Sequence, residues 1–165
     1  MLLDYMILIA LWPLGIICWY LFIPNNKRRE GFLALMMFQA IIWFCDMPAF
    51  RFGVISAPVR LFPKATDLAL TINYIFYPVL FSIFYVHMRF MSRLTHRVLS
   101  LLFWVSFITL FDIMIERYTD LLEYGFITWY GMWVYIGFLF YVSQVCCNWF
   151  FKDKTLFRMN RWKVQ

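Results

Sequence analysis

The sequence predicts an all-α integral membrane protein, a helical bundle of about five transmembrane helices. Hydrophobic residues make up 64% of the 165-residue chain and charged residues only 15%, whereas a soluble domain is nearer half apolar and a quarter charged. Long apolar runs alternate with short polar or basic segments. Because each spanning helix needs roughly 20 residues, about five spans use nearly the whole chain and predict a single transmembrane domain over residues 1–165.

The five apolar runs predict the positions of the helices, at about 2–23, 31–47, 67–88, 98–115 and 126–151. Pro13 and Pro78 are expected to kink the first and third helices, because proline removes a backbone donor. The first two helices are joined by a short basic turn, which predicts an antiparallel hairpin. The second run is short, and the proline-rich segment 48–66 that follows is expected to leave the helix and lie at the membrane interface.

Basic residues indicate the orientation in the membrane. If alternate loops lie on one side, 11 of the 15 basic residues gather there: Lys27, Arg28, Arg29, Arg89, Arg93, Arg97, Lys152, Lys154, Arg158, Arg161 and Lys163. The positive-inside rule then predicts an outside N-terminus and a cytoplasmic C-terminus. The same clusters would attract anionic lipid headgroups on the cytoplasmic face.

Several functional classes are disfavoured by the residues. The net charge of +6 does not indicate nucleic-acid binding, because the basic residues lie between apolar runs rather than on one solvated face. The chain has no GxSxG, P-loop or HExxH motif, so no enzyme is predicted. Its four cysteines lack metal-ligand spacing, so neither a metal nor another cofactor is predicted. Cys146 and Cys147 are expected to be packing residues, with acylation as the alternative.

A group of acidic residues is the first candidate site. Asp112, Glu116, Asp120 and Glu123 share one helix face if the fourth helix continues beyond the membrane boundary. This stripe predicts a cation- or proton-binding site facing outward. The alternative, which we favour, is a structural cluster in which Asp112 accepts hydrogen bonds from Tyr74 or Tyr77. The acidic residues of this cluster would form ion pairs with the basic residues Arg51, Arg60, Lys64 and Arg117.

Further polar residues are expected within or near the membrane. Gln39 and Asp46 lie seven residues apart on nearly the same face of the second helix. Hydrogen bonds between helices explain this pair better than transport does. Arg117 and Tyr118, at the end of the fourth span, are further candidates for intramembrane polar contacts.

From about residue 62 onward the chain resembles a family of small, uncharacterised multi-pass membrane proteins of Bacillus-type spore-forming bacteria. The resemblance lies in segments 62–67 (FPKATD), 76–81 (FYPVLF), 116–118 (ERY) and 124–129 (YGFITW). It implies a location in the bacterial cytoplasmic membrane. It implies no activity, cofactor or partner.

Three functions are therefore expected, in order of preference. The first is a non-enzymatic accessory or interaction subunit, whose partner is a membrane protein or a second copy of the chain. Gly131 and Gly137 would allow other helices to approach closely. The second is a small cation or proton transporter that uses the acidic stripe. The third is a lipid-handling protein that uses the segment from Arg51 to Lys64.

Overall fold

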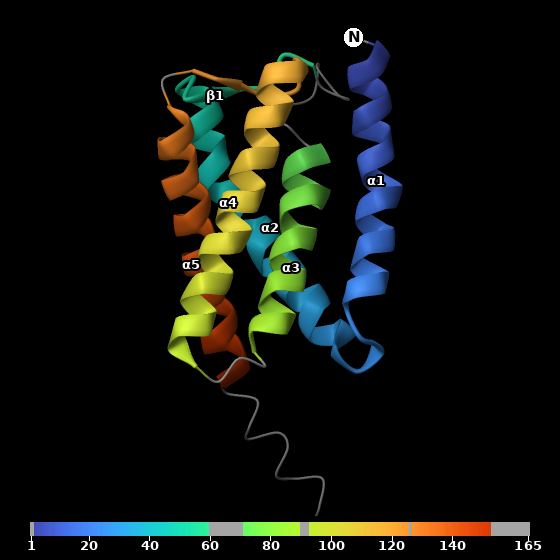
Figure 1. The fold of residues 1–165 in the computed structure, drawn as a ribbon, viewed down its shortest axis with the longest axis vertical. Helices are drawn as coiled ribbons and strands as arrows, with labels where there is room; N and C mark the ends of the chain where they lie inside the picture. Colours follow the sequence, from blue (N-terminus) through green and yellow to red (C-terminus); the bar gives the residue numbers. More distant parts are fainter. Residues whose placement is uncertain (1, 60–70, 90–92, 126, 153–165) are drawn as a thin grey trace, which may run out of the picture.

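A computed structural model of the chain describes residues 2–59, 71–89, 93–125 and 127–152 (Figure 1). These residues form an all-α bundle, which confirms the predicted fold class. Its five α-helices are α1 (Leu2–Phe22), α2 (Arg28–Arg51), α3 (Tyr77–Met88), α4 (Leu94–Tyr118) and α5 (Trp129–Lys152). The smaller elements are a 3-10 turn η1 (Asn25–Lys27), a π-helical turn η2 (Ile72–Phe76) and two short strands, β1 (Ile55–Ser56) and β2 (Glu123–Tyr124).

Successive helices run in opposite directions (Figure 1). The start of α2, the end of α3, the start of α4 and the end of α5 lie at one end of the bundle. We call this the basic end, because Arg28, Arg29, Arg89, Arg93 and Arg97 belong to these helix ends. At the opposite end, β1 and β2 pair antiparallel, with Ile55 opposite Tyr124 and Ser56 opposite Glu123.

Among the described residues, four helices are long and apolar enough to cross a membrane: α1, α2 together with η1, α4 and α5. Their length and composition fit a membrane-embedded protein. The predicted third span appears as a shorter apolar helix over Ile72–Met88, and residues 67–70 of that prediction lie outside the described residues.

The second helix is longer than predicted, and Pro48 does not end it. Pro48 lies inside α2, close to its end, so its missing N–H removes one bond from the last turns only. Three backbone hydrogen bonds of 2.9 to 3.1 Å then close the helix. The N–H of Phe52 bonds to the carbonyl of Pro48, that of Gly53 to the carbonyl of Phe50, and that of Val54 to the carbonyl of Ala49. The expectation that residues 48–51 lie outside the helix was therefore wrong.

The short helix α3 lies at the centre of the core. All of its residues except Leu80 and His87 are buried. Phe81 of α3 stacks on Phe38 of α2, with ring centroids 4.7 Å apart, and Phe140 of α5 meets both rings edge to face. Helices α1, α2 and α4 pack around α3, which explains how a helix too short for the usual span can be stable within the bundle.

The π-helical turn η2 precedes Pro78 and accommodates it. The N–H of Tyr77 bonds to the carbonyl of Ile72, five residues earlier, so the turn is wider than in an α-helix. Pro78 then falls in the first turn of α3, where a missing N–H costs little. The helical run continues through the predicted kink site, and the wide turn brings Asn73 and Tyr77 into the core.

The first two helices run antiparallel from a short turn, as predicted (Figure 1). The first helix packs mainly against η2 and α3 rather than against α2, so the expectation of a tight hairpin was wrong. The indole N–H of Trp12 donates to Thr71 Oγ1, and that of Trp19 donates to Ser82 Oγ, both at 3.3 Å. The Ser82 hydroxyl in turn donates to the carbonyl of Gly31, at 2.6 Å. Helix α3 therefore separates α1 from α2, and the two helices diverge from their shared turn (Figure 1).

Candidate functional site

Two carboxyl groups from different helices are buried in the bundle. Asp46 belongs to α2 and is 4% exposed, and Asp112 belongs to α4 and is 0% exposed. Ionisable groups at membrane depth are costly and are functional candidates by default. Together with Asn73, Tyr77 and Tyr135, which bond to them, they form what we call the core polar network.

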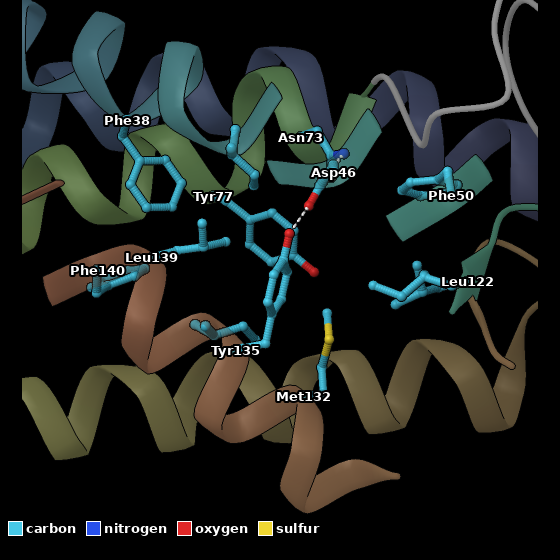
Figure 2. Close-up of a pocket in the computed structure, with 13 residues that line it drawn as sticks. Phe38, Asp46, Phe50, Asn73, Tyr77, Leu122, Met132, Tyr135, Leu139 and Phe140 are labelled. Atoms are coloured by element: carbon cyan, nitrogen blue, oxygen red, sulfur yellow. Dashed lines mark hydrogen bonds between the residues drawn. The ribbon is translucent and has the colours of Figure 1, made fainter. Parts of the chain in front are cut away.

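Both oxygens of Asp46 are hydrogen-bonded (Figure 2). Asn73 Nδ2 donates to Oδ2, and the hydroxyl of Tyr135 donates to Oδ1, each at 2.5 Å. These donors come from η2 and α5, whereas Asp46 lies on α2. One carboxyl group thus holds three elements together and is fully paired.

Asp112 is bonded through one oxygen only. The hydroxyl of Tyr77 donates to its Oδ1 at 2.8 Å. Its Oδ2 is buried and has no hydrogen-bond partner among the described residues. Leaving a buried acceptor without a partner costs about 1–3 kcal/mol, so this oxygen is the least satisfied point of the network.

A cavity of about 10 Å³ lies beside the network, with room for about one water molecule. Asp46, Asn73, Tyr77 and Tyr135 supply its polar lining, and the other residues around it are apolar (Figure 2). Tyr77 both lines the cavity and bonds to Asp112. Tyr77 therefore lies between Asp112 and the cavity that Asp46 lines. This cavity is too small for an organic substrate.

The predicted acidic stripe does not exist as a helix face. Helix α4 ends at Tyr118, and the next residue, Thr119, is extended. Its hydroxyl donates to the carbonyl of Ile115 at 2.6 Å and closes the helix. Asp120 and Glu123 therefore lie beyond the helix, and the expectation that all four carboxylates share one face was wrong.

The four acidic residues have separate surroundings. Asp112 is in the core, and Asp120 is exposed. Glu116 is half-buried and lines an open groove of about 590 Å³ with Ile127, Thr128 and Trp129. Glu123 accepts a hydrogen bond from the Ser56 hydroxyl at 3.3 Å, across the β1–β2 pair. The carboxylates do not converge on one ligand.

The structural alternative is confirmed in part. Tyr77 bonds to Asp112 as expected. Arg51, Arg117 and Tyr118 are exposed, and within the described residues no ion pair joins either arginine to Asp112. Arg60 and Lys64 lie outside the described residues. The hydroxyl of tyrosine, rather than a basic side chain, is thus the observed partner of Asp112.

Gln39 and Asp46 do not act as a pair. Asp46 makes the expected bonds between helices, whereas Gln39 is half-buried in a hollow on the outside of the bundle, next to Trp43 and Tyr74. Sequence reasoning missed Asn73 and Tyr135. Asn73 could have been noticed as an amide within an apolar run, but Tyr135 is one of 10 tyrosines, and nothing in the sequence distinguishes it.

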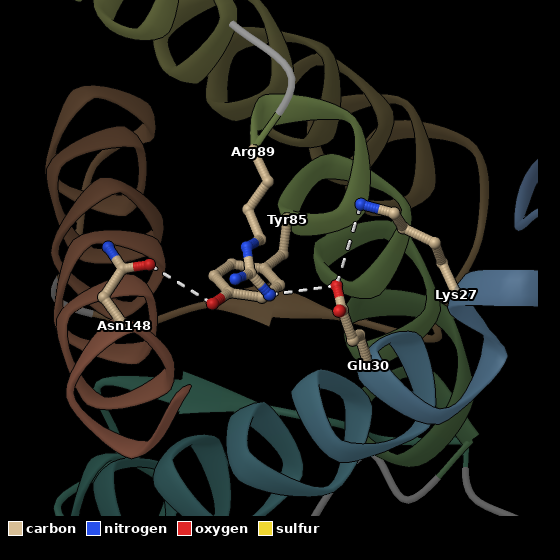
Figure 3. A network of polar contacts seen from close by, with 5 residues as sticks. All are labelled: Lys27, Glu30, Tyr85, Arg89 and Asn148. Atoms are coloured by element: carbon tan, nitrogen blue, oxygen red, sulfur yellow. Dashed lines mark hydrogen bonds and ion pairs between the residues drawn. The ribbon is translucent and has the colours of Figure 1, made fainter. Parts of the chain in front are cut away.

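A second set of polar contacts lies at the basic end (Figure 3). Glu30 of α2 accepts a bond from Arg89 Nη1 at 2.9 Å and lies 4.0 Å from Lys27 Nζ. Nearby, the hydroxyl of Tyr85 donates to Asn148 Oδ1 at 3.2 Å. These contacts join α2, α3 and α5, although half-exposed ion pairs such as Glu30–Arg89 stabilise a fold only weakly.

Within the described part of the chain, no three His, Cys, Asp or Glu side chains are grouped closely enough to hold a metal ion. Fold and site together define a membrane-embedded all-α bundle with a buried carboxyl network. Comparison with known proteins adds no closer assignment: no family model, curated protein or solved structure matches the chain. The resemblance to a family of spore-forming bacteria stays a prediction.

Proposed function

We propose that the chain is a non-enzymatic, multi-pass protein of the bacterial cytoplasmic membrane that acts as an accessory or interaction subunit. The observation that carries this proposal is the contrast between the core and the outer surface. The cavity beside the carboxyl groups holds about one water molecule. By contrast, large apolar side chains are exposed along α1, α2, α4 and α5. Contacts with other molecules are therefore to be expected on the outer faces of the helices.

The core polar network fits this function as a set of bonds that fixes the helices relative to one another. Asp46 links α2 to η2 and α5, and Asp112 links α4 to α3. Hydrogen bonds between membrane helices are worth about 0.6–2 kcal/mol each. A bundle held in this way presents its outer surface in one defined arrangement, as a subunit that binds a partner requires.

The proposed orientation places the basic end in the cytoplasm and the β1–β2 end outside. The arginines at the helix ends around Arg89 and Arg93 support it, because the positive-inside rule assigns such loops to the cytoplasm. Anionic lipid headgroups are the partners that we propose for this end. The lipid-handling alternative depends on the segment from Arg51 to Lys64, of which residues 60–64 lie outside the described residues, and it stays a prediction.

The first prediction concerns the assembly itself. The affinity-tagged chain, extracted from its native membrane in a mild detergent after brief chemical cross-linking, should elute as an oligomer or with a defined membrane protein. Size-exclusion chromatography with light scattering gives the mass of the complex. A lone monomer that co-purifies with nothing would remove the support for this function.

One observation favours a second candidate function, a proton or cation carrier. Asp112 Oδ2 is buried without a partner among the described residues, and Tyr77 connects its carboxyl group to the cavity beside Asp46. If this path carries protons, Asp112→Asn should abolish flux in proteoliposomes that contain a pH-sensitive dye. Glu123→Gln, at the β1–β2 end, is the matched control and should leave the flux unchanged. Equal flux through wild type and Asp112→Asn would eliminate the carrier.

A further inference from the structure

The core polar network does not include Gln39, and its position on the outside of the bundle needs a separate explanation. Gln39 is residue 12 of the 24 in α2, so at 1.5 Å per residue it lies about 17 Å from either end of the helix. It is half-buried beside a hollow of about 400 Å³ that Met36, Ala40, Trp43 and Tyr74 also line. Its amide thus lies near the middle of the membrane, on the outer face of the bundle.

The amide of Gln39, beside this hollow, lacks a partner among the described residues. No hydrogen bond joins the Gln39 side chain to another described residue. The indole N–H of Trp43, four residues further on, also has no acceptor among the described residues, but it is buried and an occupant of the hollow does not reach it. A lipid acyl chain could fill the hollow but cannot bond to the Gln39 amide, and an unbonded amide in an apolar environment is costly. The hollow therefore fits an occupant that has hydrogen-bonding groups at mid-membrane depth.

The surroundings of Gln39 have the shape of a helix-packing surface. Phe32, Met36, Ala40 and Phe44 follow one another at four-residue intervals, and all are exposed. Such rows form the ridges that pack into the grooves of another helix. The smallest member, Ala40, lies at the centre, where a small side chain allows two helix backbones to approach. We call this set the Gln39 surface: Phe32, Met36, Gln39, Ala40, Trp43 and Phe44.

The symmetry of a membrane selects the occupant. Two copies of one chain inserted with the same topology can form a closed pair only around an axis along the membrane normal. Each residue of a surface near that axis then meets its own counterpart at the same depth. Gln39 would face Gln39 of the second copy. Because a primary amide is both a donor and an acceptor, the two side chains can satisfy each other reciprocally.

We infer that the chain self-associates as a parallel dimer, with α2 packed against α2 of a second copy through the Gln39 surface. This inference rests on the proposed interaction function and names its partner. Ala40 would lie at the helix crossing, the two Gln39 amides would bond beside it, and Met36 and Phe44 would pack on either side.

Cysteine cross-linking in the native membrane tests the geometry of the dimer. In a background where the four native cysteines are replaced by serine, Ala40→Cys should form a disulfide-linked dimer on mild oxidation, since a disulfide needs Cα atoms within about 7 Å. Phe103→Cys on α4, where the native side chain is 66% exposed, is the control and should give no dimer. Absence of the Ala40→Cys dimer, or equal yields at both positions, would overturn the inference.

Energy transfer between labelled copies in liposomes tests the role of the amide. Gln39→Leu should weaken the dimer by about threefold to thirtyfold, the range expected for a hydrogen bond between membrane helices. Gln144→Leu, the same substitution on α5, should leave dimerisation unchanged. An unchanged dimer affinity in Gln39→Leu would contradict the inference. Because Gln39 makes no hydrogen bond to another described residue, the thermal unfolding of Gln39→Leu should match that of wild type when both are kept monomeric in excess detergent.

The liposome measurement and the purification from native membranes together distinguish self-association from the wider interaction function. If the purified chain is monomeric in liposomes but elutes from native membranes with a different protein, self-association is wrong and the interaction function stands. A chain that is monomeric in liposomes and elutes alone from native membranes contradicts both.

Discussion

At the scale of residues, Asp46 and Asp112 show how one side-chain type acquires two different roles. Both are buried aspartates on long apolar helices. Both oxygens of Asp46 accept a hydrogen bond, whereas Asp112 accepts one bond and its other oxygen has no partner among the described residues. The difference comes from the donors that neighbouring helices supply, and it predicts different responses to the same substitution.

We therefore expect Asp46→Asn to lower the free energy of unfolding by about 1–2 kcal/mol, because an amide nitrogen cannot accept a bond from Asn73 or Tyr135. Asp112→Asn should change it by less than about 0.5 kcal/mol, since the amide oxygen can still accept from Tyr77 and the amide nitrogen takes the place of an oxygen that has no partner. Titration with denaturing detergent in mixed micelles measures both variants. Equal losses of unfolding free energy in the two variants would contradict the difference between Asp46, which is bonded through both oxygens, and Asp112, which is bonded through one.

At the scale of elements, the start of α2 packs closely at Gly31 against Ile23, which follows α1, and against Ser82 of α3. A Cβ atom on Gly31 would lie 2.8 Å from Ile23 Cδ1 and 3.2 Å from Ser82 Oγ. The Ser82 hydroxyl also bonds to the Gly31 carbonyl. The start of α2 can pack against α3 at this point because residue 31 has no side chain.

Gly31→Val should lower the free energy of unfolding by about 1–3 kcal/mol, the usual cost of overpacking a buried contact. Gly137→Ala is the control, because a Cβ atom there would lie 3.8 Å from Val105 Cγ1, an ordinary contact distance. Thermal unfolding in detergent compares the two variants with wild type. A Gly31→Val variant as stable as Gly137→Ala would show that α2 and α3 can separate at little cost.

At the scale of the whole molecule, the alternating helices gather the basic helix ends at one end of the bundle (Figure 1). The same alternation brings β1 and β2, more than sixty residues apart in the chain, together at the other end. Because a charged loop crosses a membrane with difficulty, this segregation predicts which loops remain in the cytoplasm.

A membrane-impermeant thiol reagent should label Asp120→Cys in intact cells, in a background where the four native cysteines are replaced by serine. Asn25→Cys, in the turn between α1 and α2, should react only after the membrane is opened. A reporter fused to the C-terminus should have the same accessibility as residue 25. Finding residue 25 and the C-terminus on opposite faces would reject the proposed topology.

The sequence by itself determined the all-α fold class and the approximate positions of the helices. These features follow from local properties, because hydropathy and helix length are read over roughly 20 consecutive residues. Pro48 and Pro78 show the limit of local rules. Pro48 was expected to end the second helix and Pro78 to kink the third. In the structure, the last turns of α2 and the wide turn η2 accommodate the missing N–H donors.

Only the tertiary structure decided which polar groups meet. Asp46 finds its two partners 27 and 89 residues further along the chain, and no local pattern specifies such pairs. The acidic stripe failed for a local reason, since α4 ends at Tyr118 and the hydroxyl of Thr119 bonds to the carbonyl of Ile115, which leaves Asp120 and Glu123 beyond the helix. The length of an apolar run specifies a helix within that run, whereas a hydrogen-bonded network between helices forms only where several helices pack together.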